Sequence, residues 1–120
     1  VSLQYGDMKS TIDSVEKNTC QKIIQYNKID NKNDIDSLFA LIRACDQVIT
    51  IDNATAHFSG ALGVETHVLL PRTADWRWGT SSNKSYWYNS LRLHRQDQVG
   101  NWKTALKSLA DKIKNMRPKL

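Results

Sequence analysis

The stretch that decides the fold is Val48-Ile49-Thr50-Ile51-Asp52-Asn53-Ala54-Thr55-Ala56-His57, which continues to Gly63. Its first four residues are mostly β-branched and apolar and have the length of a strand. The apolar residues that follow return at helical spacing and predict a buried stripe: Ala54, Phe58, Ala61 and Leu62. Gly63 is a typical helix terminator. We therefore expect a strand that passes directly into a helix.

Strands and helices are also expected after Gly63. Thr66 to Leu70 is a short apolar strand ended by Pro71, and a further strand is expected from Ser90 to His94. A C-terminal amphipathic helix is predicted by the apolar residues Trp102, Ala105, Leu106, Leu109, Ile113 and Met116.

The N-terminal part begins with a predicted strand, Val1 to Gln4, and a turn in which Asp7 can cap a helix. Lys22 to Tyr26 has the pattern of a second strand, and the polar stretch from Asn27 to Asn33 that of a surface loop. Asp34 is expected to cap the next helix. The apolar stripes of the two helices are Met8, Ile12 and Val15, and Ile35, Leu38, Phe39 and Ile42.

Alternating strands and helices of these lengths imply an α/β fold with right-handed crossovers. We expect a Rossmann-like three-layer α/β/α domain with a mainly parallel sheet. At 120 residues, with 40% hydrophobic and 24% charged residues, the chain has the size and composition of one globular domain, covering residues 1–120.

The charge balance favours an anionic partner. The 17 Lys and Arg residues against 12 Asp and Glu give a net charge of +5. Much of the excess lies near the C-terminus, in Lys103, Lys107, Lys112, Lys114, Arg117 and Lys119. These charges are not interleaved with exposed aromatics, so they are typical of a solvated helix face rather than a nucleic-acid interface.

Cys20 and Cys45 are too few for a disulfide framework and lack metal-site spacing. We expect both to be reduced and to lie in or near the core. No apolar run has the length of a membrane span, and the N-terminus lacks the pattern of a signal peptide, so a cytoplasmic location is expected.

Several catalytic motifs are absent from the sequence, namely G-x-G-x-x-G, G-x-x-x-x-G-K-[ST], G-x-S-x-G and clustered His/Cys ligands. Their absence disfavours a dinucleotide oxidoreductase, a P-loop NTPase, a serine hydrolase and a zinc enzyme.

The candidate site is the turn after Ile51, because ligands of parallel sheets bind beyond the carboxyl ends of the strands. The first N–H groups of the following helix have no intrahelical partner and, with the helix dipole, favour a phosphate. Asn53, His57 and Gly60 are expected on a face that looks into a cleft. Asp52 and Asn53 are equally plain helix-cap residues, and His57 a structural hydrogen-bonding residue.

A second candidate is the aromatic segment that contains Asp75-Trp76-Arg77-Trp78 and Tyr86-Trp87-Tyr88. Large aromatics in a loop either plug the end of the sheet or stack on a base or sugar ring. Arg77, Arg92 and Arg95 are candidates for phosphate contacts.

Together these stretches resemble heptosyltransferase-like glycosyltransferases, in the domain that follows the acceptor-binding domain. The similar segments are Val1 to Asp7, Ile49 to Gly63, Val68 to Pro71, Asp75 to Trp78, Trp87-Tyr88 and Arg92 to Gln96. The branch in which this domain follows tetratricopeptide repeats is the more similar one. The resemblance runs in order over nearly the whole chain.

The resemblance implies a GT-B arrangement, in which two Rossmann-like domains face each other and the C-terminal one holds a nucleotide-diphosphate sugar. Asp52, Thr55 and His57 match the family's Asp-Thr-x-x-x-His turn, which meets the diphosphate and sugar. No cofactor and no metal are implied, because helix N–H groups can stabilise the leaving diphosphate. The expected donor-site residues are Gln4, Tyr5, Gly6, Asp52, Asn53, Ala54, Thr55, His57, Trp76, Arg77 and Trp78.

The sequence departs from the family pattern at several positions. Asn53 stands where Thr is usual, His94 where Phe is common, and Tyr86 and Asn89 where prolines flank the Trp-Tyr pair. The family's strand before Val1 and its acceptor domain have no counterpart here. We therefore expect a fragment of a longer protein, with some tendency to self-associate and complete its sheet. The alternative is a catalytically silent binding or scaffold domain.

Overall fold

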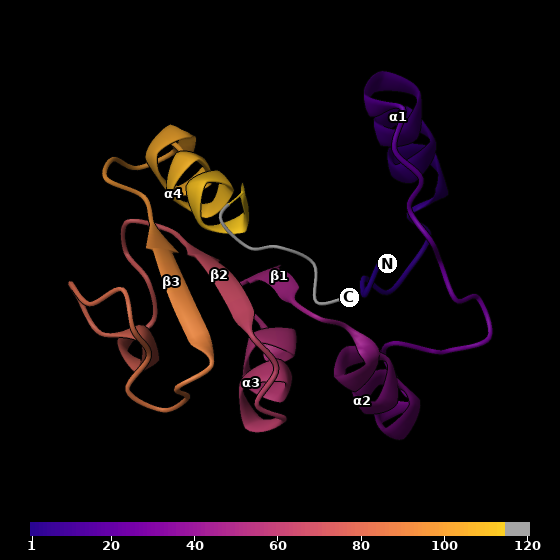
Figure 1. Cartoon of the computed structure of the whole chain (residues 1–120), viewed down its shortest axis with the longest axis horizontal. Coiled ribbons are helices and arrows are strands. Elements are labelled where there is room, and N and C mark those ends of the chain that lie inside the picture. The colour runs from indigo at the N-terminus through magenta and orange to yellow at the C-terminus, as the bar shows by residue number, and fades with distance from the viewer. Residues whose placement is uncertain (115–120) are drawn as a thin grey trace. The chain divides into compact units, whose positions relative to one another are not determined.

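The computed structural model of the chain describes residues 1–114 (Figure 1). It forms two units, Val1–Ile42 and Arg43–Leu120. The expectation of one domain over residues 1–120 stays a prediction. The predicted residues Met116, Arg117 and Lys119 lie outside the described residues.

The second unit contains a parallel sheet. Its strands are β1 (Val48–Ile51), β2 (Thr66–Leu70) and β3 (Leu91–Arg95), in the order β1-β2-β3. Ile51 is in register with Leu69, and Leu69 with His94. The predicted bounds of β1 and β2 are confirmed, and β3 is shifted by one residue from the expected range. The α/β class with a parallel sheet is confirmed.

Helices cover both faces of this sheet (Figure 1). Helix α3 (Ala54–Ala61) contacts β1 and β2, and helix α4 (Lys103–Lys114) contacts β2 and β3. Val68 lies in the cluster that includes Ala56 of α3. Successive strand residues point to opposite faces, so His67 lies on the other face. There it contacts His94, which in turn contacts the hydroxyl of Ser108 in α4. The three-layer α/β/α arrangement therefore follows.

The face of the sheet under α3 holds the hydrophobic core. Its buried members are Ala56, Val68, Leu70, Trp78, Leu91 and Leu93, and Tyr88 packs against them. A Cβ on Gly60 would lie 2.5 Å from Tyr88 Cγ, so α3 approaches this ring too closely for any larger residue.

The predicted buried stripe of α3 is wrong in part, since only Phe58 and Leu62 of its four residues are partly buried. Ala54 and Ala61 are exposed, whereas Ala56, Ser59 and Gly60 are buried. The reason is the close approach to Tyr88, which demands small residues on the inner face and overrides the hydrophobic pattern. Four apolar residues that were expected in the stripes of the other helices are likewise more than a third exposed: Val15, Ile35, Trp102 and Leu106.

The unit Val1–Ile42 is built around helix α1 (Lys9–Thr19), and helix α2 (Ile35–Ala44) begins within it. The predicted strands Val1 to Gln4 and Lys22 to Tyr26 are wrong, since both segments are irregular. A backbone hydrogen bond of 2.9 Å joins Ser2 N to Ile24 O. Both segments have the composition of a strand, but within residues 1–42 neither forms a ladder of hydrogen bonds with a neighbouring strand. A strand needs such a neighbour for its backbone N–H and C=O groups.

Local caps agree with the sequence more closely. Asp34 Oδ1 accepts the backbone N–H of Ser37 at 3.1 Å, which confirms the predicted cap of α2. The predicted cap of α1 by Asp7 is wrong, because the N-cap is Met8 without a side-chain cap bond. Asp7 Oδ1 instead accepts the N–H of Lys9, the first residue of the helix, at 3.0 Å. Cys20 is exposed, contrary to the prediction, and forms the C-cap of α1 in a left-handed conformation with φ of 55°. Cys45 is partly buried, and neither cysteine forms a disulfide.

None of the helices within residues 1–114 is long and apolar enough to cross a membrane.

A chain of polar contacts is buried between the sheet and α4. His67 Nδ1 lies 2.9 Å from His94 Nε2, and His94 Nδ1 lies 2.9 Å from the Ser108 hydroxyl. Burial lowers the pKa of His94 to about 4, with smaller contributions from His67 and Lys112. Burial also lowers the pKa of His67, opposed by the Glu65 carboxylate. Both imidazoles are thus held neutral.

This pair predicts a loss of stability in mild acid. An unfolded histidine binds a proton near pH 6.5, whereas folded His94 does so only near pH 4. The contribution of His94 is complete well above pH 6.5 and falls as the pH drops toward 4, by up to about 1.4 kcal/mol per pH unit. The lowered pKa of His67 acts in the same direction. Urea unfolding between pH 7.5 and 5 measures how the free energy of unfolding changes with pH. His94→Phe should make this pH dependence shallower, and an unchanged slope in that variant contradicts the assignment.

Candidate functional site at the carboxyl edge of the sheet

The parallel register brings the ends of β1 and β2 to one edge of the sheet. Asp52 follows β1, and Trp78 lies in the short 3₁₀ helix η1 (Trp76–Trp78) after β2. Asp52 Oδ1 accepts the indole Nε1–H of Trp78 at 2.7 Å. Trp78 is fully buried, so this bond satisfies a donor that has no access to water.

The start of α3 is fixed beside this pair. Asn53 has extended backbone angles, and its side chain accepts the N–H of Ala56. Thr50 Oγ1 donates to Asn53 Oδ1 at 3.0 Å, which orients the cap from the end of β1. The predicted capping role of Asn53 is confirmed. The backbone N–H groups of Ala54 and Thr55 belong to the first turn, where a helix offers them no carbonyl partner.

His57 lies one turn further along α3, between two aromatic rings. It stacks on Trp78 with ring centroids 4.9 Å apart and an angle of 26°. Its Nδ1 is 3.3 Å from the hydroxyl of Tyr88, whose ring meets it edge-on. The imidazole is therefore positioned by packing and by a hydrogen bond. Gly60, which was expected to face a cleft with His57, instead faces the ring of Tyr88, so that expectation is wrong.

The guanidinium of Arg95, at the end of β3, holds the loop that carries Trp78. It donates to the carbonyls of Trp78, Gly79 and Ser82, the last two at 3.1 Å each. Arg92 donates to the carbonyl of Asn89 at 2.8 Å. Both arginines were candidates for phosphate contacts, and both are engaged by the backbone of the loop.

The outer side of η1 is exposed. Asp75 Oδ1 accepts the backbone N–H of Arg77 at 3.0 Å and forms an ion pair with its guanidinium at 2.8 Å. The Arg77 backbone N–H, with the guanidinium, lowers the pKa of the Asp75 carboxyl. Trp76 is largely exposed, and the Arg77 guanidinium lies 5.1 Å from its ring centroid.

The structure thus brings six predicted residues to one edge of the sheet, with Trp76 and Arg77 on its outer side. The six are Asp52, Asn53, Ala54, Thr55, His57 and Trp78. Sequence reasoning missed the contacts made by Tyr88, Thr50 and Arg95. The Trp-Tyr pair and the polar Thr50 within an otherwise apolar strand were the available signals, but neither pattern gives the partner of the side chain.

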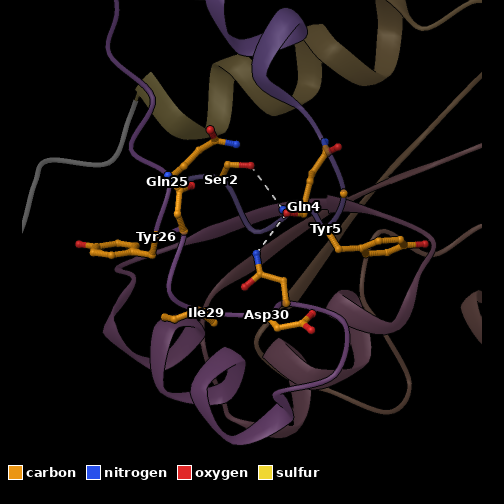
Figure 2. A pocket seen from close by; sticks show the side chains of 10 residues that line it. Ser2, Gln4, Tyr5, Gln25, Tyr26, Ile29 and Asp30 are labelled. Atoms are coloured by element: carbon orange, nitrogen blue, oxygen red, sulfur yellow. Dashed lines mark hydrogen bonds between the residues drawn. The ribbon is translucent and has the colours of Figure 1, made fainter.

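The other three predicted residues, Gln4, Tyr5 and Gly6, lie in the unit Val1–Ile42. They line a pocket of about 210 Å³ together with residues of the segments 25–27 and 29–31 (Figure 2). Asn31 Nδ2 donates to the carbonyl of Gln4 at 3.2 Å. Gly6 has φ of 86°, a conformation that favours glycine. The pocket wall is mainly polar, with Tyr5 and Tyr26 largely exposed.

Within residues 1–114 no group of three or more His, Cys, Asp or Glu side chains is arranged to hold a metal ion.

Comparison with known proteins gives one curated relative, Protein FlbA from Caulobacter vibrioides. It is 33% identical over 115 residues, which cover 96% of this chain and 19% of that protein. The chain therefore spans about a fifth of the length of the curated relative it matches. No family model matches the chain. No solved structure matches it either.

The bond between Asp52 and Trp78 predicts a coupled loss of stability. Asp52→Ala leaves the buried indole N–H without its acceptor, which should lower the free energy of unfolding by about 1–3 kcal/mol. In a Trp78→Phe background the same change should cost far less. Urea unfolding of the four proteins of this double-mutant cycle gives the coupling.

Asp46→Ala is the matched control, because Asp46 is an exposed carboxylate near the start of β1. It should change the free energy of unfolding by less than about 0.5 kcal/mol. Equal costs for Asp52→Ala in both backgrounds would contradict the proposed bond.

Proposed function

We propose that this chain is the nucleotide-diphosphate-sugar-binding module of a glycosyltransferase. The observation that carries the proposal is the start of α3 at the carboxyl end of β1, where Asp52 and His57 stand beside first-turn N–H groups. A helix N-terminus favours an anion through its free N–H groups and its dipole. The resemblance to heptosyltransferase-like enzymes supports the same ligand for the same turn.

The N–H groups of Ala54 and Thr55 and the imidazole of His57 would meet the diphosphate. In an inverting transfer, an acceptor hydroxyl attacks the anomeric carbon while the bond from that carbon to the diphosphate oxygen breaks. The diphosphate leaves with the electron pair, and fixed donors stabilise its growing charge. A base that takes the proton of the acceptor would come from an acceptor domain of a longer protein.

The proposed location of the protein is the cytoplasm.

A catalytically silent scaffold is the second candidate, and one observation favours it. Asp52 and His57 have structural partners of their own, Trp78 and Tyr88. If Asp52 and His57 serve only these contacts, their role is to stabilise the fold, and they need not bind a ligand.

Titration of the 120-residue chain with UDP, ADP and GDP tests the proposal. At least one of them should shift the amide resonances of Ala54 and Thr55 and change the tryptophan fluorescence at millimolar concentration or below. His57→Ala should weaken that binding about tenfold, since it removes one hydrogen bond to a charged group. No response to any of the three nucleotides would reject the donor site.

His94→Phe is the matched control for His57→Ala, because His94 lies on the α4 side of the sheet. It should leave nucleotide binding within about twofold. If His57→Ala and Asp52→Asn both fold and bind as the unaltered chain does, the scaffold function replaces the transferase.

We also propose that a second copy of the chain is a partner. Strand β1 is at the edge of the sheet, and its side chains Ile49 and Ile51 are 53% and 56% exposed. Such an edge can pair with a strand of another copy. Light scattering from 10 µM to 1 mM should show a mass that rises with concentration. Ile49→Lys should suppress the rise, and a constant monomer mass of the unaltered chain would contradict the prediction.

A further inference from the structure

Three large aromatic side chains stand on the surface of the segment that follows β2. Trp76, Tyr86 and Trp87 are 72%, 76% and 61% exposed. Trp78 and Tyr88, their neighbours in the sequence, fill the core instead. The aromatic segment therefore contains two kinds of residue: some pack in or against the core, and others have rings that are exposed to solvent. These three exposed residues are named the aromatic platform below.

The platform is held by specific contacts. The indole N–H of Trp87 donates to the carbonyl of Arg77 at 3.0 Å. Trp76 and Trp87 meet edge to face, with centroids 6.4 Å apart and an angle of 78°. The ring of Tyr86 packs on Gly79, where a Cβ would lie 2.7 Å from Tyr86 Cε2. Fixed rings lose little conformational entropy when a ligand covers them.

The size of the platform fits a small ligand better than a protein. An aromatic side chain offers about 150–250 Å², so these three expose on the order of 400 Å². A stable protein interface needs about 800 Å² on each partner. The residues at 81, 83 and 84, which precede Tyr86 in the chain, are Ser, Asn and Lys, and all three are exposed.

The shape selects a sugar ring over a nucleobase. A flat base is held best between parallel faces, but Trp76 and Trp87 stand 78° apart and form a corner. A puckered pyranose presents C–H groups on a face and along an edge, and can contact both indoles. Asp75 and Arg77 place a carboxylate and a guanidinium beside Trp76, where they can bond sugar hydroxyls.

The platform also adjoins the diphosphate site in sequence and structure. Trp76 and Trp78 belong to the same single turn of 3₁₀ helix, and Trp78 stacks on His57. We propose that Trp76 and Trp87, with Tyr86 beside them, bind the pyranose ring of a saccharide next to the diphosphate end of α3. This inference rests on the proposed function for the placement of the sugar, and its test separates the two.

The experiment measures binding of the 120-residue chain to three groups of probes by calorimetry and by the indole N–H resonances. The first group is UDP-glucose, ADP-glucose and GDP-mannose, and the second is UDP, ADP and GDP. The third is the free saccharides maltotriose and diacetylchitobiose. Trp76→Ala and Trp87→Ala should each weaken binding of a sugar-containing probe about fivefold to tenfold. Binding of the sugar-free diphosphates should change less than about twofold.

Trp102→Ala is the matched control, since Trp102 is a partly exposed tryptophan before α4 and outside the platform. It should leave all affinities unchanged. Trp87→Phe keeps an aromatic ring without the N–H and should recover part of the binding. Thermal unfolding of each variant verifies that it folds, and the indole shifts of the unaltered chain report the contact without any substitution.

The outcomes distinguish the source of the sugar. A loss confined to the nucleotide sugars assigns the platform to the donor, and a loss for the free saccharides assigns it to an acceptor. Saccharide binding that depends on Trp76 in a chain that binds no nucleotide would reject the proposed function and keep the platform.

Three results would overturn the platform itself. The first is a chain that binds no sugar-containing probe. The second is equal affinity of the tryptophan variants and the unaltered chain. The third is an equal loss for the sugar-free diphosphates, which would place the nucleotide on the tryptophans.

Discussion

The parallel register of the three strands is the constraint on which the rest of the structure depends. Ile51 pairs with Leu69, and Leu69 with His94, so the residues that follow each strand emerge at a common edge. Only this register allows the carboxylate of Asp52 to meet the indole of Trp78, from a loop that begins after β2. A shift of one residue would turn His67 and His94 toward the α3 side and Val68 and Leu93 away from it.

The second constraint is the long connection from β2 to β3. Residues 71–90 contain no α-helix, although a crossover between parallel strands usually contains one. Trp78 and Tyr88 occupy the face of the sheet that such a helix would cover, and Arg95 anchors the loop through three carbonyls. The prediction that these aromatics plug the end of the sheet is therefore confirmed for part of the segment, and their stacking on a base or sugar ring stays a proposal. Trp78 lies in the core and Tyr88 packs against it, whereas Trp76 and Trp87 are exposed.

Local sequence patterns correctly predicted the elements whose conformation depends mainly on residues nearby in the sequence. The β-branched run of β1, the Asp34 cap and the Asn53 cap depend on neighbours in sequence, and all three are confirmed. The buried face of α3 was mispredicted because Tyr88, far along the chain, sets the space available at Gly60. Val1 to Gln4 has the composition of a strand, but a ladder requires a second strand that composition does not supply. The strand-to-helix turn after Ile51 is present as predicted. The partners of Asp52 and His57, Trp78 and Tyr88, come from far along the chain, where no local pattern indicates them.

The structural contacts of Asp52 and His57 do not exclude a ligand; they restrict which part of it each can meet. A carboxylate has two oxygens, and only Oδ1 of Asp52 is bound by Trp78. A second anion would repel it, so a hydroxyl donor of the sugar or ribose is the favourable partner for the remaining oxygen. If the Tyr88 hydroxyl donates to His57 Nδ1, the proton of a neutral imidazole is on Nε2, where it can be donated to a phosphate oxygen. The same contacts that fix these side chains would thus assign the diphosphate to His57 and the helix N–H groups, and a hydroxyl to Asp52.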